Sequence, residues 1–378
     1  MIGCGMDDLG AQERAVLELI TANPFAGQQD IANMLGLARS TVAAHVVQLV
    51  QKGYILGRGY VLPASKRIAV LGGAVFDRKY HARAPLISAT SNPVDGHRSF
   101  GGVARNVAEN LARLGVTTSF VSIVGDDDTG RSIIRHLRDL GVDTSQIIVT
   151  GEAPTAEYAA ILGMENELVL GIADMGIFDL FQPAHLDRAW PHLAAASWVF
   201  ADCNLPDETL RALITRKQGA RFRLAIDTVS SPKARRLPKD LTGIDILFLN
   251  LDEAHAVLGR HENEPRLSPE EATDRLRAGG ICEVVLTMGA AGLLVSGAEG
   301  MARIDAVPAQ PVDVTGAGDA MIAGTLYSLL TGANLANGAR TGSLLATLTT
   351  ENKASVHPLL SPQFLAAHLH RIPERTPL

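Results

Sequence analysis

The sequence predicts an α/β protein whose mostly parallel sheet is covered by helices on both faces, preceded by a small helical module. From about residue 66 onward, short apolar runs rich in valine and isoleucine alternate with amphipathic stretches, as strands and helices do in such sheets. Residues 1 to about 62 contain three short helical patterns instead. Because 378 residues exceed the usual size of one compact domain, we expect two units joined by a linker at Pro63-Ala64-Ser65.

The first unit has the pattern of a winged helix-turn-helix. Its first helix carries apolar residues from Ala15 to Ile20 on one face and ends at Asn23-Pro24. A second helix is expected over 28–35 and a third over 40–52, each followed by a glycine. Residues 54–62 then predict a small hairpin with a glycine turn.

The third helix of this unit is a candidate for contacting DNA. Its outward side chains are donors and acceptors suited to phosphates and base edges, namely Arg39, Ser40, Thr41, His45 and Gln48. The net charge of the chain is −6, and residues 1–62 are slightly acidic. A module that keeps this fold for docking or dimerisation, without binding DNA, is therefore the alternative.

The second unit is expected to place its ligands at one edge of the sheet. The predicted strands are Arg67–Leu71, Thr118–Val124, Trp198–Asp202, Leu224–Asp227, Ile246–Asn250 and Glu283–Thr287. The predicted helices between them include Val103–Leu114, Arg131–Leu140, Asp207–Thr215 and Pro269–Ala278. The runs Thr155–Leu162 and Leu168–Asp174 alternate like a hairpin. Ligands of parallel sheets bind beyond the carboxyl ends of the strands, and the motifs considered next fall at those ends.

Bulk properties favour a soluble cytosolic protein. The N-terminus carries Asp7 and Asp8 and no long apolar run, unlike a signal peptide. The most apolar helical run, around Ala320–Leu330, is too short to span a bilayer. Cys4, Cys203 and Cys282 have neither disulfide-like nor zinc-like spacing.

The segment Asp313-Val-Thr-Gly-Ala-Gly-Asp319 is the first candidate for chemistry. Its glycines allow backbone N–H groups to converge at the start of the following helix, where the helix dipole also attracts an anion. Asp319 would lie beside this cradle, so its carboxylate could accept the proton of a hydroxyl that attacks a bound phosphoryl group. The alternative is an ordinary N-capping residue after a glycine turn, and the chain has no Walker A motif.

Four motifs together resemble the ribokinase-like PfkB family of carbohydrate and nucleoside kinases. They are D-x-x-G-A-G-D at Asp313–Asp319, a Gly-Gly stretch ending in Asn at Phe100–Asn106, N-x-x-E at Asn250–Glu253 and T-x-G-x-x-G at Thr287–Gly292. Their order and spacing agree with the family over residues 66–378. The resemblance implies a ribokinase-like three-layer α/β/α fold in residues 66–378, with a small β lid formed by segments near 80–100 and 155–174. The winged helix-turn-helix would occupy residues 1–62.

The resemblance also implies roles for individual residues. The catalytic group would comprise the base Asp319 and the anion hole of Gly316, Ala317 and Gly318. The acceptor would contact Asp77, Gly101, Gly102 and Asn106. ATP would contact Asn250, Thr287, Gly289 and Gly292. Mg²⁺ would be organised through water by Asn250 and Glu253, which are oxygen donors as that ion prefers. A monovalent cation such as K⁺ would be held by Asp313, Thr315 and Ser355.

Some of these residues, and the neighbouring Arg105, have simpler alternatives. Asp77 could be a turn residue at a strand end, and Asn250 with Glu253 could be an exposed helix cap. Arg105, which precedes Asn106, could reach a phosphate or the substrate, or lie in solvent as an ordinary helix residue.

Within the family, the chain resembles bacterial pseudouridine kinases and related nucleoside kinases, some of which carry an N-terminal helix-turn-helix. The segments that carry this resemblance include Ser91-Asn-Pro93, Gly101–Gly115 and Ala201–Leu205. Two positions differ, because Val75 and Ala173 stand where such proteins tend to have asparagine. A site that loses polar donors often changes its substrate, so pseudouridine, another nucleoside and a free pentose all stay open as acceptors.

The expected function is ATP- and Mg²⁺-dependent phosphorylation of the 5′-hydroxyl of pseudouridine or a similar nucleoside. The alternatives are a kinase for ribose or another sugar, and a nucleoside-sensing transcriptional regulator that binds operator DNA through residues 1–62. A homodimer is expected, since both a winged helix and an exposed lid sheet favour one.

Overall fold

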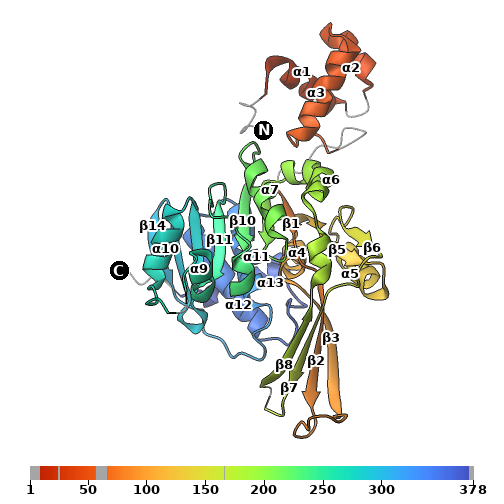
Figure 1. The fold of residues 1–378 in the computed structure, drawn as a ribbon. Coiled ribbons are helices and arrows are strands. Elements are labelled where there is room, and N and C mark those ends of the chain that lie inside the picture. Colours follow the sequence, from red (N-terminus) through yellow and green to blue (C-terminus); the bar gives the residue numbers. More distant parts are fainter. Residues whose placement is uncertain (1–8, 24–25, 57–65, 166, 262, 374–378) are drawn as a thin grey trace.

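The computed structural model describes residues 9–23, 26–56, 66–165, 167–261 and 263–373 of the chain. They form a unit of three helices and a larger α/β unit from which a small sheet projects (Figure 1). Among the described residues, no helix combines the length and apolarity that crossing a bilayer requires.

The N-terminal unit contains the three expected helices. They are α1 (Ala11–Ala22), α2 (Gln28–Leu35) and α3 (Arg39–Gln51). Their shared core contains Val16, Ile20, Ile31, Val42 and Leu49, each with no exposed surface. Most of the expected hairpin, residues 57–62, lies outside the described residues, and residues 54–56 form no strand. The unit meets the larger one where the guanidinium of Arg221 lies 4.0 Å from the ring centre of Tyr54.

The main sheet contains eight strands in the order β14-β13-β12-β11-β10-β9-β1-β4. These are β1 (Arg67–Leu71), β4 (Thr117–Val121), β9 (Trp198–Asp202), β10 (Arg223–Asp227), β11 (Ile246–Asn250), β12 (Glu283–Thr287), β13 (Leu293–Gly297) and β14 (Gly300–Ile304). Strands β4, β1, β9, β10, β11 and β12 are parallel, as predicted. Strands β13 and β14 add an antiparallel edge. The predicted strand 118–124 is divided into β4 and β5 (Ile123–Gly125), and β5 pairs with β6 (Ile148–Thr150).

Helices cover both faces of this sheet, which gives the three layers of a ribokinase-like fold. Alternate residues of β1 point to opposite faces, so Ala69 and Leu71 join one core while Ile68 and Val70 join the other. The first core is covered by α6 (Pro183–Ala194), α7 (Asp207–Lys217), α9 (Leu251–Val257) and α10 (Pro269–Ala278). The second is covered by α4 (Val103–Arg113), α5 (Asp128–Asp139), α11 (Ala317–Leu330) and α12 (Leu335–Thr350). Shorter helices are α8 (Ser231–Ala234), α13 (Pro362–His368) and the 3₁₀ turns Gly176–Leu180, Gly289–Ala291 and Leu369–Arg371.

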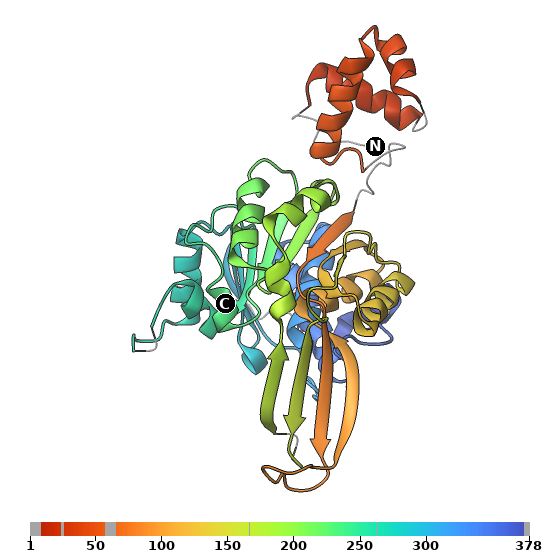
Figure 2. The same ribbon diagram turned by 45° about the vertical axis from the view of Figure 1, so that its right-hand side comes forward.

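A separate four-stranded sheet projects from the main unit (Figure 2). Its order is β3-β2-β7-β8, with β2 (Val75–Ala82), β3 (Val94–Gly101), β7 (Glu157–Leu162) and β8 (Leu168–Asp174). It is built from the two segments that the sequence assigned to a lid. Strand β2 follows β1 after three residues, and β3 runs almost directly into α4. The small sheet is therefore attached at the carboxyl edge of the main sheet.

The junction between the two sheets depends on a buried carboxylate, Asp202 at the end of β9. It has no exposed surface. Its oxygens accept hydrogen bonds from the backbone N–H groups of Gly73 (3.1 and 3.2 Å) and Ala104 (2.9 Å), and from that of Asn204 (3.0 Å). Burial raises the pKa of Asp202, although these donors oppose the shift. One side chain thus joins the end of β1, the start of α4 and the loop after β9.

Replacing this carboxylate by an amide should destabilise the fold. In Asp202→Asn, an NH₂ group would face backbone donors in a buried site, so we expect the free energy of unfolding to fall by about 2–3 kcal/mol. Urea unfolding followed by circular dichroism measures this change. The control is Asp207→Asn, whose carboxylate is exposed at the start of α7. Equal unfolding midpoints for the two variants would contradict the role given to Asp202.

Candidate active site

Three predicted site residues from distant parts of the chain meet at the carboxyl edge of the main sheet. Asp319 lies in the first turn of α11, Asn106 in the first turn of α4, and Asp77 on β2. The side-chain amide of Asn106 donates a hydrogen bond of 2.6 Å to Oδ2 of Asp319. The negative charges of Asp77 and Asp319 also act on each other electrostatically. The sequence interpretation of these three residues as one site agrees with this geometry.

The glycine segment before Asp319 forms the start of α11. Gly316 is the residue before the first helical turn and has a φ of 82°. A Cβ at this position would lie 2.0 Å from the backbone oxygen of Ser355, so both the conformation and the space require glycine. Ala317 and Gly318 follow as the first helical residues. The N–H of Ala317 donates to the backbone oxygen of Val314 (3.2 Å), whereas the N–H of Gly318 has no acceptor within the helix. A Cβ at Gly318 would meet no atom within 4 Å. The segment therefore presents an open, electropositive helix end of the kind that binds phosphate.

The environment of Asp319 raises the pKa of its carboxyl group. Burial raises the pKa of Asp319 to about 6, and the charges of Asp202 and Asp77 add to that effect. The hydrogen bond from Asn106 and the charge of Arg105 oppose it. A carboxylate whose pKa lies near the working pH is suited to accept a proton during a reaction.

Asp77 faces the glycines that precede α4. Burial raises its pKa to about 6, against the opposing charges of Arg105 and Lys79. A Cβ on Gly101 would lie 2.0 Å from Oδ2 of Asp77. Gly102 has a φ of 93°, and a Cβ there would lie 2.5 Å from the backbone oxygen of Gly73. An exposed turn residue would not show such contacts, so the simpler alternative for Asp77 does not hold.

Arg105 is a functional neighbour that the sequence interpretation left out. It is buried, with 2% of its surface exposed, and this corrects the view of it as a residue in solvent. Its guanidinium donates to the side chains of Glu109 and Asn106 and to the backbone oxygen of Phe100. Burial alone would raise the pKa of Glu109. The pKa is instead lowered to about 2 by the hydrogen bonds from His136 and Arg113 and by the charge of Arg105. Arg105 and Glu109 are four residues apart on α4, and this i,i+4 spacing is the one sequence signal that could have indicated their ion pair.

The far side of the site is formed by the ends of β10, β11 and β12. Asn250 and Thr287 are register partners on β11 and β12, which places both nucleotide-side motifs together. Gly289 begins a 3₁₀ turn. At Gly292, φ is 88° and a Cβ would lie 2.1 Å from the backbone oxygen of Ile304. Gly292 is therefore required by close packing against the segment after β14, whereas Gly289 is exposed and a Cβ there would meet no atom within 4 Å.

Asn250 and Glu253 form the helix cap that was considered as an alternative. The Asn250 side chain accepts from the Glu253 N–H (2.9 Å), and Oε2 of Glu253 accepts from the Asn250 N–H (2.9 Å). Oε2 also accepts from the hydroxyl of Thr228 (2.7 Å). Glu253 is buried rather than exposed. The capping role is thus confirmed, and it fixes this carboxylate at the strand ends.

The acids around this cap could help to organise a hydrated divalent cation. Burial raises the pKa of Asp227 at the end of β10 well above its ordinary value, and the charges of Glu253 and Asp319 add to this. Such mutual repulsion is what a cation relieves. In the part of the chain that the structure describes, no three His, Cys, Asp or Glu side chains could together hold a metal ion. Mg²⁺ at this site would therefore take most of its ligands from phosphate and water.

Comparison with known proteins agrees with this geometry. A model of the pfkB family of carbohydrate kinases matches residues 65–361. The chain belongs to this family. A second model, of winged helix-turn-helix DNA-binding domains, matches residues 11–55. The protein is therefore a pfkB-family kinase, which transfers a phosphoryl group to an alcohol, with an N-terminal winged helix-turn-helix.

Relatives of this pfkB-family kinase cover most of its length. It is 31% identical to "Uncharacterized sugar kinase YeiI" of Escherichia coli over 351 residues, which is 93% of this chain and 96% of the relative. It is 29% identical to the pseudouridine kinase of Escherichia coli over 262 residues, 68% of this chain and 82% of the relative. The solved structure of a carbohydrate kinase from Agrobacterium tumefaciens superposes with a TM-score of 0.71 at 32% identity, covering 82% of this chain and 98% of that one.

The expected ligands of a monovalent cation already have a charged partner in this pfkB-family kinase. The ammonium of Lys79 lies 2.6 Å from Oδ2 of Asp313 and 2.9 Å from the hydroxyl of Thr315. Ser355 is close to the same loop, with its backbone oxygen against Gly316 and its hydroxyl 3.3 Å from the oxygen of Phe100. The sequence did not indicate Lys79.

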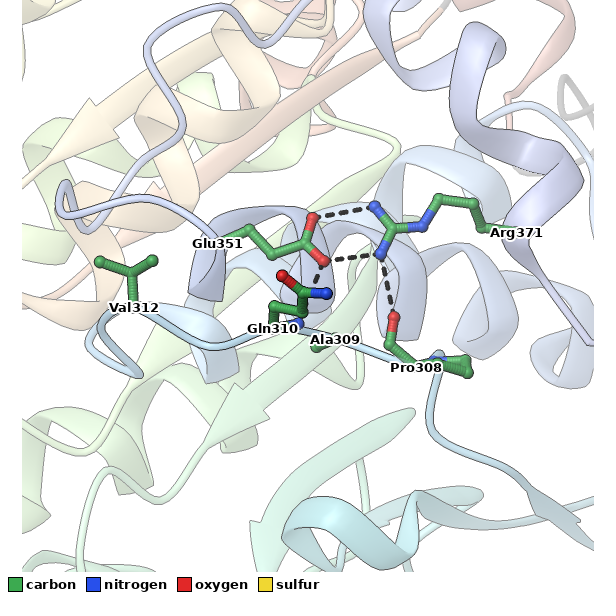
Figure 3. Close-up of a pocket in the computed structure, with 6 residues that line it drawn as sticks. All are labelled: Pro308, Ala309, Gln310, Val312, Glu351 and Arg371. Atoms are coloured by element: carbon green, nitrogen blue, oxygen red, sulfur yellow. Dashed lines mark hydrogen bonds and ion pairs between the residues drawn. The ribbon is translucent and has the colours of Figure 1, made fainter.

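A surface hollow of about 600 Å³ lies next to the loop that leads to Asp313 (Figure 3). It is lined by Pro308, Ala309, Gln310, Val312, Glu351 and Arg371. The charged groups in it are already paired, since Arg371 donates to both oxygens of Glu351 at 2.7 and 2.9 Å. None of the predicted catalytic or substrate residues lines it. The chemically active groups gather at the strand ends instead.

The predicted DNA-contacting residues of the N-terminal unit differ in their exposure. Arg39 and Ser40 are exposed at the start of α3, and Thr41 is half-buried. His45 is also half-buried, and its Nε2 lies 3.3 Å from Oε1 of Gln12 on α1. Gln48, further along α3, is exposed as well. Arg39, Ser40 and Gln48 are therefore accessible to a phosphate.

The two raised pKa values predict how the rate should depend on pH. Since Asp319 must be ionised to accept a proton, and Asp77 would bind a hydroxyl best as a carboxylate, kcat/KM should fall below pH 6. With both groups titrating, the slope of log(kcat/KM) should approach 2. In Asp77→Asn the slope should approach 1. A profile that is flat from pH 7 to about pH 5, in protein whose circular dichroism shows it folded, would contradict this assignment.

Proposed function

We propose that the protein is an ATP- and Mg²⁺-dependent kinase for the 5′-hydroxyl of pseudouridine or a similar nucleoside. The observation that carries the proposal is the Asn106–Asp319 hydrogen bond beside the open start of α11. The carboxyl of Asp319, with a pKa raised to about 6 by burial, lies at the start of α11, where the helix end is suited to bind phosphate. A base and an anion cradle side by side are the parts that phosphoryl transfer to a hydroxyl needs.

The reaction can be written from these groups. Asp319 accepts the proton of the acceptor hydroxyl, whose oxygen forms a bond to the γ-phosphorus. The bond from that phosphorus to the β–γ bridging oxygen breaks, and ADP leaves. The N–H groups at Gly318 and its neighbours stabilise the charge on the transferred group. Mg²⁺, held through water by Asn250 and Glu253, would neutralise the phosphates.

The acceptor side favours a polar ligand. Asp77 and the backbone at Gly101 and Gly102 would bind sugar hydroxyls. Beyond them, the buried Asn204 accepts a hydrogen bond from the ammonium of Lys233, and both lie at the strand ends near Asp202. Such donors suit the carbonyl groups of a pyrimidine base. The likeness to a pseudouridine kinase supports this acceptor.

The two unusual positions differ in their relation to this site. Val75 is buried at the start of β2 opposite Gly101, and so removes a polar group close to the acceptor. Ala173 is exposed on β8, opposite Tyr158. We therefore expect Val75 to have the larger effect on substrate choice. An ATP-coupled assay across pseudouridine, the common nucleosides, ribose and fructose identifies the acceptor, and ATP use with none of them would contradict the proposal.

Loss of the base should stop turnover without stopping binding. Asp319→Asn keeps the size of the side chain, so we expect kcat to fall by ~10²-fold or more while the acceptor and ATP still bind. Steady-state kinetics and calorimetric titration measure the two effects. Asp128→Asn is the matched control, because Asp128 also lies in the first turn of a helix but is fully exposed. Turnover near the wild-type rate in Asp319→Asn would show that another group is the base.

A second function is favoured by the N-terminal unit. We propose that residues 11–55 bind operator DNA through the start of α3, which would make the enzyme a regulator of its own operon. In a gel-shift assay with DNA from upstream of the gene, Arg39→Ala should weaken binding about uniformly across sequences and lower the salt slope by about one. If the wild-type protein shows no salt-dependent binding to DNA, the N-terminal unit has a structural role instead.

We also propose a homodimer formed through the small sheet. Strand β8 is an edge strand, and Leu168, Val169, Leu170 and Ile172 on it are each more than half exposed. An exposed apolar edge of this kind is a site for pairing. Sedimentation equilibrium tests this, and a monomer at micromolar concentration would contradict it.

A further inference from the structure

Lys79 places a positive charge inside the loop that forms the phosphate cradle. It belongs to β2 of the small sheet, two residues after Asp77 and therefore on the same face of the strand. Its ammonium bridges Oδ2 of Asp313 (2.6 Å) and the hydroxyl of Thr315 (2.9 Å). About three quarters of each side chain in the Lys79–Asp313 pair is buried. These lengths are those of charge-assisted hydrogen bonds, so the contact is specific.

Asp313 holds the shape of the cradle loop. Its Oδ1 accepts the N–H of Thr315 (2.8 Å), and its own N–H donates to the backbone oxygen of Thr350 (3.1 Å). Gly316 follows three residues later. Partial burial would raise the pKa of Asp313, but Lys79 and Thr315 outweigh it and lower the pKa. The carboxylate is thus ionised close to the position where the cradle must accept a phosphate.

A negative charge at this place would oppose phosphate binding unless a cation neutralised it. A monovalent metal ion and an ammonium carry the same charge, and both take oxygen atoms as partners. Of the three residues that the resemblance assigned to the ion, Asp313 and Thr315 already receive the ammonium of Lys79 on a side-chain oxygen. The third, Ser355, has its hydroxyl 3.3 Å from the backbone oxygen of Phe100. An added K⁺ would have to displace Lys79 or repel it at close range. The residues therefore do not fit a separate monovalent ion.

We propose that Lys79 is the built-in cation of the phosphate cradle, so that phosphoryl transfer by this protein needs no monovalent metal ion. The inference rests on the proposed kinase reaction at Asp319. It also assigns Lys79 a positioning role, because the ammonium comes from the small sheet while its partners belong to the loop before α11. The cradle loop is neutralised only when the small sheet lies against it.

The neighbouring arginine provides a matched control. Arg78 lies on the opposite face of β2 and pairs with Glu157 of β7 at 2.7 Å, within the small sheet. Removing its charge changes the same strand without touching Asp313. A comparison of Lys79→Met with Arg78→Met therefore separates the cation at the cradle from a general effect on β2.

The first measurement is the initial rate with saturating ATP, Mg²⁺ and acceptor, in KCl, RbCl or choline chloride at equal ionic strength. The wild-type rate should agree within about twofold in all three salts. Lys79→Met should lose ~10-fold or more of its rate in choline chloride, since one group at an anion hole contributes on that scale. KCl or RbCl should restore most of that loss. Arg78→Met should behave like the wild type.

The second measurement needs no turnover. The thermal unfolding midpoint of Lys79→Met should rise when KCl replaces choline chloride, because a ligand that binds the folded state stabilises it. The midpoints of the wild type and of Arg78→Met should not change. Lys79→Gln, which keeps a hydrogen-bond donor but no charge, should respond as Lys79→Met does.

The outcomes are separable. A wild-type rate that rises more than about tenfold with K⁺ overturns the inference, and so does a Lys79→Met protein whose midpoint ignores K⁺. If no acceptor is phosphorylated, but the midpoints respond as expected, the proposed kinase reaction fails while the assignment of Lys79 stands. If Lys79→Met does not fold, the wild-type rates and the Lys79→Gln midpoint decide the question.

Discussion

The segments that carry Asp77 and Asn106 are joined by one buried carboxylate, Asp202. Its two oxygens receive backbone N–H groups from Gly73, Ala104 and Asn204. Buried N–H groups without an acceptor are costly, so the end of β1, the start of α4 and the loop after β9 must stay where this side chain can reach them. Asp77 lies on the strand that follows the end of β1, and Asn106 lies in the first turn of α4. A Cβ on Gly72 would lie 2.2 Å from Oδ1 of Asp202, which is why the chain turns there on glycine.

The electrostatics of the site are a balance between acids at strand ends and two cations placed behind them. Burial raises the pKa of Asp319, and the charges of Asp202 and Asp77 add to that effect. Arg105 opposes this from within the protein, anchored by Glu109. Lys79 acts from the other side, on Asp313. Without Arg105 the pKa of Asp319 would lie higher, so less of the predicted base would be ionised near neutral pH.

Much of the fold was open to prediction because its signals are local. The alternation of apolar runs identified the six parallel strands, and the glycine motifs identified the helix starts that carry Asn106 and Asp319. The antiparallel edge of β13 and β14 was not predicted. The hairpin expected after α3 depended on residues 57–62, which lie outside the described part. Local patterns therefore indicated the scaffold and the motif residues of the site.

The residues that the sequence did not indicate depend on distant contacts. Asp202 and Gly73 are 129 positions apart, and Lys79 and Asp313 are 234 positions apart. Neither pairing has a spacing that a motif could reveal. Arg105 could be taken for a solvated helix residue, but it is buried and its guanidinium donates to the backbone oxygen of Phe100 on β3. His45 was expected to face outward, but α1 packs close enough for it to meet Gln12. Motifs thus predicted which groups react, while only the packing identified the groups that hold them.

The attachment of the small sheet has a consequence for measured affinities. Its strands β2 and β3 connect to the main unit through Gly72-Gly73 and Gly101-Gly102, and the second pair also lies against Asp77. A movement of β2 and β3 would therefore bend the backbone that is predicted to line the acceptor position. The apparent Kd for an acceptor then equals the intrinsic value divided by the fraction of molecules with the sheet in place. Two acceptors that make the same contacts with the main unit would differ in affinity if only one of them also stabilised the small sheet in this position.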